Sequence, residues 1–411
     1  MHQRVGQYGY VAKSDIQRFY PSIYTHSIPW AVHGKSAAKK DTNPSSANIT
    51  FNKLDQLLRR GQDAQTVGIP IGPDTSRIIG ELIGCAVDKL IASTTPKKFL
   101  DCIRHVDDIY FGADSREEAE ACIATLRSAL REFGLEINET KTEIYRVSAL
   151  RDDSWPRALS RRLESYKKTP DDIFGLFEEA FEISERTKSE APVRYLLRRA
   201  SKQEVFEHDH WSVAENFLVK CAYDYPHSTD YVARILVWRN ILFSDVDKEK
   251  WIRVINNRLI HNTKLGHDHE ICWLLWATIA LDFPLIDQTS NELVAYPNPL
   301  VALMGAQALS RKLIGDAVDL SQWESYIDNS QLDEEWWIFA YECSLRGWLK
   351  KNLSTASLAG TIFADLKANG VSFYNDKTPS EYEDYYEDDG PIPGTSLGYE
   401  DEEEAEDDGT I

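Results

Sequence analysis

The first 150 residues alternate between short apolar stretches at strand spacing and longer stretches at helical spacing. Residues 8–15 are rich in aromatic and β-branched residues, which is typical of a strand, and this strand ends at Asp15. The predicted order is a strand over 8–15, a Gly/Pro loop over 68–77, a helix over 78–91, a strand pair around 104–112, a helix over 115–133, and a turn and strand over 134–147. We therefore expect an α+β domain in residues 1–150.

From about residue 155 the pattern changes to successive amphipathic helices, in which apolar residues recur every three or four positions. Helix pairs in units of about 40 residues predict a HEAT-like solenoid. No internal sequence similarity accompanies these units, so an irregular helical bundle stays an equal alternative. We expect Trp273, Trp276, Trp336 and Trp337 in the core of this all-α domain, over residues 151–378.

The distribution of charge distinguishes a third part of the chain, at its C-terminal end. The chain of 411 residues has a net charge of −20, and residues 381–411 hold fourteen Asp or Glu and no Lys or Arg. We expect residues 379–411 to be a disordered acidic tail, because such a segment cannot bury enough apolar surface to fold. Residues 1–150 hold nineteen basic and eighteen acidic residues, so an acidic average does not exclude a nucleic-acid groove there.

The cysteines and the apolar runs indicate the cellular compartment of the protein. The six cysteines form no C-x-x-C pair and are expected to be reduced core residues. The sequence shows no apolar run of about 18 residues and no signal-peptide pattern. We expect a cytoplasmic protein with no membrane partner.

Two adjacent acids, Asp107 and Asp108, stand between apolar runs in "RHVDDIYFG". Taken alone, the pair is common in turns. Asp15 ends another predicted strand, however, and neighbouring strands would bring all three carboxylates to one point. Hard cations such as Mg²⁺ or Mn²⁺ require this ligand set, and two such ions can activate a hydroxyl and neutralise a leaving pyrophosphate.

Other residues fit the same chemistry. Tyr20 is placed to wall the sugar of a nucleotide and exclude a 2′-hydroxyl. Gly72 and Pro73 belong to a rigid loop that permits close backbone approach, and Arg77 offers donors to phosphate. Lys141 is a cation suited to protonating or neutralising pyrophosphate. Each residue also has a purely structural interpretation, as core, helix entry or surface charge.

Four segments resemble the polymerase motifs of reverse transcriptases, in the family's order. "DIQRFYPSIYTHSIPW" resembles motif A, "QTVGIPIGPDTSR" motif B, "RHVDDIYFG" motif C and "GLEINETKT" motif D. The wording of motifs A and B and the helical second half most resemble bacterial defence-associated, or abortive-infection, reverse transcriptases. The sequence differs at the head of motif C, where His105 replaces an aromatic residue, and in motif B, where Ile71 replaces glutamine.

The resemblance implies a reverse-transcriptase palm followed by the all-α domain and the acidic tail. It implies Asp15, Asp107 and Asp108 as catalytic metal ligands, Lys141 as the motif D lysine, and Tyr20 as a steric gate. The implied enzyme is an RNA-directed DNA polymerase in antiphage defence, acting on deoxynucleoside triphosphates with an RNA template, no template or a protein primer. The alternatives are a non-catalytic helical scaffold that retains a palm, and an ordinary retroelement reverse transcriptase.

A right-hand polymerase carries a fingers subdomain ahead of motif A, whereas 14 residues precede Asp15. We expect an upstream start codon, with Met1 an internal methionine. The alternative is a palm that acts with a partner polymerase or survives as a relic. The size of the helical half also leads us to expect a homo-oligomer.

Overall fold

The computed structural model describes residues 7–94, 101–149, 155–167, 169–202, 205–206, 210–354 and 358–377. The chain divides into two compact units, residues 1–152 and 153–411, which are described separately. The predicted acidic tail, residues 379–411, lies outside the described residues. No helix in the described parts of the chain is long and apolar enough to cross a membrane.

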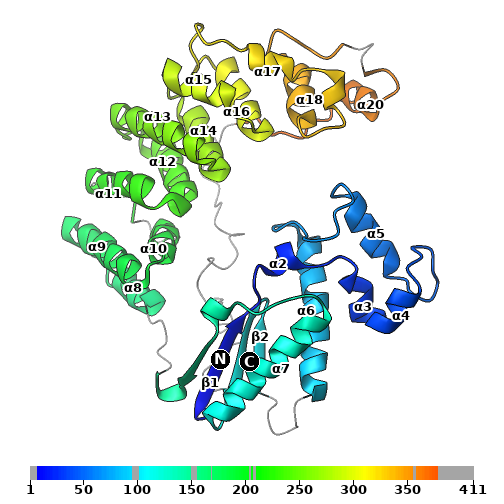
Figure 1. Cartoon of the computed structure of the whole chain (residues 1–411). Helices are drawn as coiled ribbons and strands as arrows, with labels where there is room; N and C mark the ends of the chain where they lie inside the picture. Colours follow the sequence, from blue (N-terminus) through cyan, green and yellow to red (C-terminus); the bar gives the residue numbers. More distant parts are fainter. Residues whose placement is uncertain are drawn as a thin grey trace, which may run out of the picture. The chain divides into compact units, whose positions relative to one another are not determined.

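A four-stranded antiparallel sheet forms the centre of the first unit (Figure 1). The strands are β1 (Tyr10–Asp15), β2 (Cys102–His105), β3 (Asp108–Ala113) and β4 (Glu143–Arg146), in the order β2-β3-β1-β4. The predicted end of the first strand at Asp15 and the predicted hairpin at Asp107 are confirmed. Since β1 and β3 are neighbours, the strands that carry the acids lie side by side.

The helices of this unit are α2 (Phe19–Ser22), α3 (Ser27–His33), α4 (Lys35–Lys40), α5 (Asn52–Arg60), α6 (Asp74–Thr94) and α7 (Arg116–Glu132). Helix α7 begins after Ser115, whose side chain accepts a hydrogen bond from the Glu118 amide. The predicted boundary of α6 was wrong by four residues. Pro73 accepts backbone hydrogen bonds from Ser76 and Arg77, so the first turn of this helix includes Arg77.

The two faces of the sheet differ. Ile109 and Phe111 of β3 belong to the core that includes residues of α6 and α7, whereas Tyr110 packs with Val11 in a separate small cluster. Side chains alternate between faces along a strand. Asp15 and Asp108 therefore stand on the Val11 and Tyr110 face, away from the main core.

The second unit consists of helices throughout its described residues. They are α8 (Trp155–Glu164), α9 (Pro170–Thr187), α10 (Ala191–Lys202), α11 (Trp211–Asp224), α12 (Thr229–Phe243), α13 (Lys248–Leu265), α14 (Asp268–Leu281), α15 (Asp287–Ala295), α16 (Pro299–Ser310), α17 (Ser321–Ser325), α18 (Trp337–Arg346) and α20 (Ile362–Ala368). From α8 to α18, each helix packs on the next but one, which produces two layers, one of even-numbered and one of odd-numbered helices (Figure 1). One continuous apolar core runs between them.

A buried carboxylate anchors the end of this unit. Glu342 of α18 is fully buried and accepts hydrogen bonds from Arg346 Nε at 3.0 Å and from the Tyr374 amide at 3.2 Å. Ser372 Oγ also donates to it, at 3.1 Å. Since a buried charge is costly unless it is paired, these donors fix the segment after α20 against α18.

Glu342→Ala removes the acceptor and leaves its partly buried donors without this partner. We expect the free energy of unfolding of the second unit to fall by about 3–5 kcal/mol. Chemical denaturation of the full chain measures this change. The control is Glu334→Ala, at an exposed position just before α18, which should change it by less than about 0.5 kcal/mol. Equal effects of the two substitutions would contradict the anchoring role.

Candidate active site

Strand register places two of the predicted acids opposite each other. Asp15 pairs with Asp108 across the β1–β3 ladder, and directly opposite residues in an antiparallel pair point to the same face with Cβ atoms about 4.5–5.5 Å apart. Asp107 lies next to them, in the two-residue turn between β2 and β3, and its carbonyl accepts a hydrogen bond from the Ile16 amide at 3.1 Å. The structure therefore brings Asp15, Asp107 and Asp108 together.

The turn that carries Asp107 is strained. Val106 has φ +56°, a left-handed conformation that is a true outlier for a β-branched residue. Its carbonyl accepts a hydrogen bond from Arg104 at 3.1 Å, and the same guanidinium binds Glu81 at 2.7 Å and Asp88 at 2.9 Å on α6. Arg104 thus ties the turn to the helix behind it, and such over-determined support allows local strain to persist at a functional site.

Asp15 has partners from the motif D segment. Lys141 Nζ lies 2.9 Å from Asp15 Oδ2, and Asn138 Nδ2 donates to Asp15 Oδ1 at 3.3 Å. The Asn138 amide also donates to the Asp15 carbonyl at 2.7 Å. The Asp15 side chain is 7% exposed and that of Lys141 is 61% exposed, so the lysine reaches a buried carboxylate from solvent.

The electrostatics of the three acids are coupled. Burial raises the pKa of the Asp107 carboxyl, and the negative charges of Asp15 and Asp108 raise it further. Burial likewise raises the pKa of Asp108, where Asp15 adds to the rise and Lys13 opposes it. The hydrogen bond to Asp15 raises the pKa of the Lys141 amine. The site therefore concentrates negative charge that Lys13 and Lys141 only partly offset.

These residues fit a divalent cation by their chemistry. Within the described ranges, no three His, Cys, Asp or Glu side chains are grouped to hold a metal ion as they stand. The Asp15 carboxylate points its oxygens at Lys141 and Asn138 instead. The charges of the three carboxylates still act on one another, and hard oxygen donors of this kind suit Mg²⁺ or Mn²⁺.

Tyr20 stands beside this cluster. Burial raises the pKa of its hydroxyl, Asp107 and Glu81 raise it further, and Arg77 lowers it, so the ring lies within electrostatic reach of all three. A Cβ added at Gly80 of α6 would come within 3.1 Å of the ring atom Cε1. The glycine thus lets the helix backbone approach the ring and fixes where the ring stands.

The loop before α6 contacts the segment after Asp15. The Gly68 amide donates to the Ile23 carbonyl at 2.8 Å, and the Ile69 amide donates to the Tyr20 carbonyl at 3.1 Å. Gly72 has φ +116°, and Gly72, Pro73 and Arg77 are exposed. Arg77 Nη2 lies 3.4 Å from Asp74 Oδ1. The charge of Arg77 reaches the Tyr20 hydroxyl. Direct nucleotide contact by Gly72, Pro73 and Arg77 stays a prediction.

Sequence reasoning missed Arg104 and Asn138, which position the acids without being acids themselves. Arg104 is two residues before the strained turn, a spacing that becomes meaningful only when Glu81 and Asp88 are known to face it. Asn138 lies within the motif D segment, but its bond to Asp15 joins residues 123 positions apart in the sequence.

Comparison with known proteins supports an assignment for part of the chain. Residues 1–196 match a family model described as reverse transcriptase (RNA-dependent DNA polymerase). The matched segment covers the sheet-containing unit and extends into the first helices of the second. Reverse transcriptases generally use divalent metals such as Mg²⁺. No curated protein matches the chain.

The double substitution Asp107→Asn and Asp108→Asn should stabilise the first unit at neutral pH without divalent ions. Burial raises the pKa of both carboxyls, so folding favours their protonated forms. The stability that these carboxyls contribute is present below their unfolded pKa, about 3.9, and is lost as pH rises through their folded pKa. Thermal denaturation between acid and neutral pH should show the variant's advantage disappearing in acid.

Adding Mn²⁺ should reverse the order of stability. An ion at 100 times its Kd stabilises the wild-type chain by about 2.7 kcal/mol, and the double variant should gain little. Asp114→Asn, at an exposed position after β3, is the matched control and should retain the full response. An equal Mn²⁺ response in the double variant would rule out these acids as the ligands.

Proposed function

We propose that this chain is a DNA polymerase that adds deoxynucleotides to a hydroxyl by two-metal nucleotidyl transfer. The observation that carries the proposal is the register of Asp15 opposite Asp108, with Asp107 in the adjoining turn. Asp15 and Asp108 lie on the sheet face away from the main core. The match of residues 1–196 to reverse transcriptases supports the same reaction class.

In this proposal Asp15, Asp107 and Asp108 hold two Mg²⁺ or Mn²⁺ ions. When bound, such ions lower the pKa of an attacking hydroxyl and neutralise charge on the leaving pyrophosphate. Lys141 stays protonated at neutral pH, because its bond to Asp15 raises its pKa. Its exposed, flexible side chain can turn from Asp15 towards a triphosphate and donate a proton to the leaving group.

Tyr20 acts as the sugar gate. Its ring stands against Gly80 of α6, within electrostatic reach of Asp107, where it would oppose a 2′-hydroxyl on the incoming nucleotide. Arg77, exposed in the first turn of α6, is placed to bind phosphate. Direct contact of these residues with a nucleotide is part of the proposal.

We further propose that templating is weak and that the protein serves antiphage defence. Ile71 is 72% exposed in the loop before α6, and an apolar side chain there offers no hydrogen bond to a template base pair. The resemblance of motifs A and B to defence-associated reverse transcriptases favours synthesis without a template or from a protein hydroxyl.

Incorporation of labelled deoxynucleotides into acid-insoluble product tests the activity. With Mn²⁺ or Mg²⁺ and no added template, we expect product from the wild-type chain and a loss of at least about 1,000-fold in the double variant Asp107→Asn and Asp108→Asn, because the metal ligands are removed. Asp114→Asn should retain activity. In a phage plaque assay, a bacterial host that expresses the double variant should lose protection. A host that expresses Asp114→Asn should keep it.

If the wild-type chain incorporates no labelled deoxynucleotide with or without primed RNA, the polymerase proposal is contradicted and the scaffold alternative is favoured. Efficient synthesis only with primed RNA would keep the polymerase and reject the untemplated mode. Unchanged plaque formation alongside active synthesis would reject the defence role alone.

Tyr20→Ala should lower discrimination against ribonucleotides by about 10- to 100-fold, because the obstacle to a 2′-hydroxyl is removed. Gly80→Ala should shift discrimination in the same direction by less, since the added Cβ would displace the Tyr20 ring. Gly61→Ala is the control, because its Cβ would meet the Leu58 carbonyl at an ordinary 3.5 Å. The ratio of kcat/KM for dNTP and NTP measures the effect, and an unchanged ratio in Tyr20→Ala would contradict the gate.

A further inference from the structure

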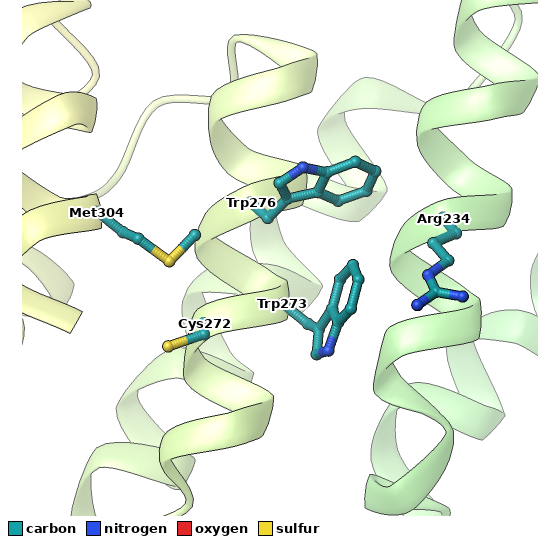
Figure 2. A pocket seen from close by; sticks show the side chains of 5 residues that line it. All are labelled: Arg234, Cys272, Trp273, Trp276 and Met304. Atoms are coloured by element: carbon teal, nitrogen blue, oxygen red, sulfur yellow. The ribbon is translucent and has the colours of Figure 1, made fainter. Parts of the chain in front are cut away.

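An apolar cavity of about 250 Å³ opens in the even-numbered helix layer of the second unit. Its lining consists of Arg234 of α12, Cys272, Trp273 and Trp276 of α14, and Met304 of α16 (Figure 2). Figure 2 shows both indoles projecting from α14 on the side of Arg234, with Met304 on the other side. We call this cavity the indole pocket.

The predicted core position of Trp273 and Trp276 is confirmed only in part, because both pack against the core but are partly exposed and line this pocket. Their ring centroids are 5.5 Å apart with planes at 76°. The Arg234 guanidinium stands 4.7 Å from the Trp273 ring centroid. Trp273 Nε1 donates to His269 Nε2 at 3.1 Å, which fixes the ring. Two rigid aromatic faces and one cation therefore surround the same space.

Arginine and aromatic side chains continue along the same layer. The Arg234 guanidinium also lies 5.8 Å from the buried Tyr231 ring. Arg194 of α10 lies 4.6 Å from that ring and is ion-paired with Asp230 of α12 at 2.7 Å. On α10, Arg199 lies 6.0 Å from the Tyr195 ring, whose hydroxyl contacts Ser160 of α8 at 2.6 Å. Contacts between these side chains thus connect α8, α10, α12 and α14.

Charge is segregated between the two layers at this end of the unit. Helix α10 carries Arg194, Arg198 and Arg199 with no acidic residue, and α8 carries three arginines and one glutamate. Helix α9, in the other layer, carries six acidic residues and one arginine. At the α8 and α10 end, the even-numbered layer is therefore the basic side, despite the acidic average of the chain.

We propose that this layer binds a single strand of nucleic acid, with one unpaired base in the indole pocket and the phosphates following α10 and α8. Basic tracks combined with aromatic platforms are the physical requirements for binding such strands without sequence preference. A base in a duplex has both faces stacked and cannot enter the indole pocket. The proposal rests on the proposed polymerase function and assigns its strand to the helical unit.

Fluorescence anisotropy with a labelled oligo-dT of about 20 nucleotides and the full chain tests this site. Arg234→Gln and Trp276→Ala should each weaken binding roughly 5- to 150-fold, because one base loses its stacking partner. Arg253→Gln, an exposed arginine on α13 of the other layer, is the charge-matched control and should change the Kd by less than about twofold. A duplex of equal length should bind more weakly than the single strand.

Conservative variants separate the pocket from general folding. Arg234→Lys retains the charge and Trp276→Phe retains an aromatic face, so both should keep more affinity than Arg234→Gln and Trp276→Ala. A folded Trp276→Ala chain with wild-type affinity would overturn the proposal. So would equal displacement of the oligonucleotide by poly-glutamate, which would instead identify an acidic peptide as the ligand.

Incorporation measured on the same variants distinguishes this proposal from the polymerase function. Pocket variants that bind oligo-dT normally, in a chain that incorporates deoxynucleotides, would reject the strand site and leave the polymerase standing. If oligo-dT binding depends on the pocket but the chain incorporates no deoxynucleotides, the strand site stands and the polymerase function is rejected. In the double variant Asp107→Asn and Asp108→Asn, binding at the pocket should persist while incorporation is lost.

Discussion

The pairing of β1 with β3 is the constraint on which the candidate site depends. It puts Asp15 directly opposite Asp108 on one face of the sheet, and like charges directly opposite each other destabilise a sheet. Side-chain alternation fixes this register, because a shift of one residue would turn the apolar residues of β3 away from the main core. The apolar packing that builds the first unit therefore also enforces the repulsion between these acids.

Much of this arrangement could be predicted from the sequence, because it follows from local pattern. The strand ending at Asp15, the hairpin at Asp107 and the helix after Ser115 were predicted from periodicity and turn chemistry. The start of α6 was not, since the Pro73 carbonyl begins that helix four residues earlier than its apolar repeat indicates. Arg104 and Asn138 were missed because their importance depends on residues far away in the chain.

The tryptophans of α14 show why spacing alone does not predict burial. Trp273 and Trp276 are three residues apart, as expected for two side chains on one face of a helix. Such spacing predicts which side of α14 they occupy but not whether the neighbouring helices close over them. Arg234 of α12 and Met304 of α16 leave a cavity there, and this outcome depends on the packing of three helices.

Asp107 and Asp108 differ from the paired buried carboxylates elsewhere in the described chain, and this contrast favours a function for the two acids. In the second unit, Glu342 has donors from α18 and from the segment after α20, and Glu215 accepts from Trp251 Nε1 at 3.1 Å and from Lys250 Nζ at 2.9 Å. Those carboxylates hold helices together. In the first unit, burial and mutual repulsion raise the pKa of Asp107 and Asp108. A fold that satisfies its structural carboxylates elsewhere gains nothing in stability from this pair, so binding a cation is the better explanation for their presence.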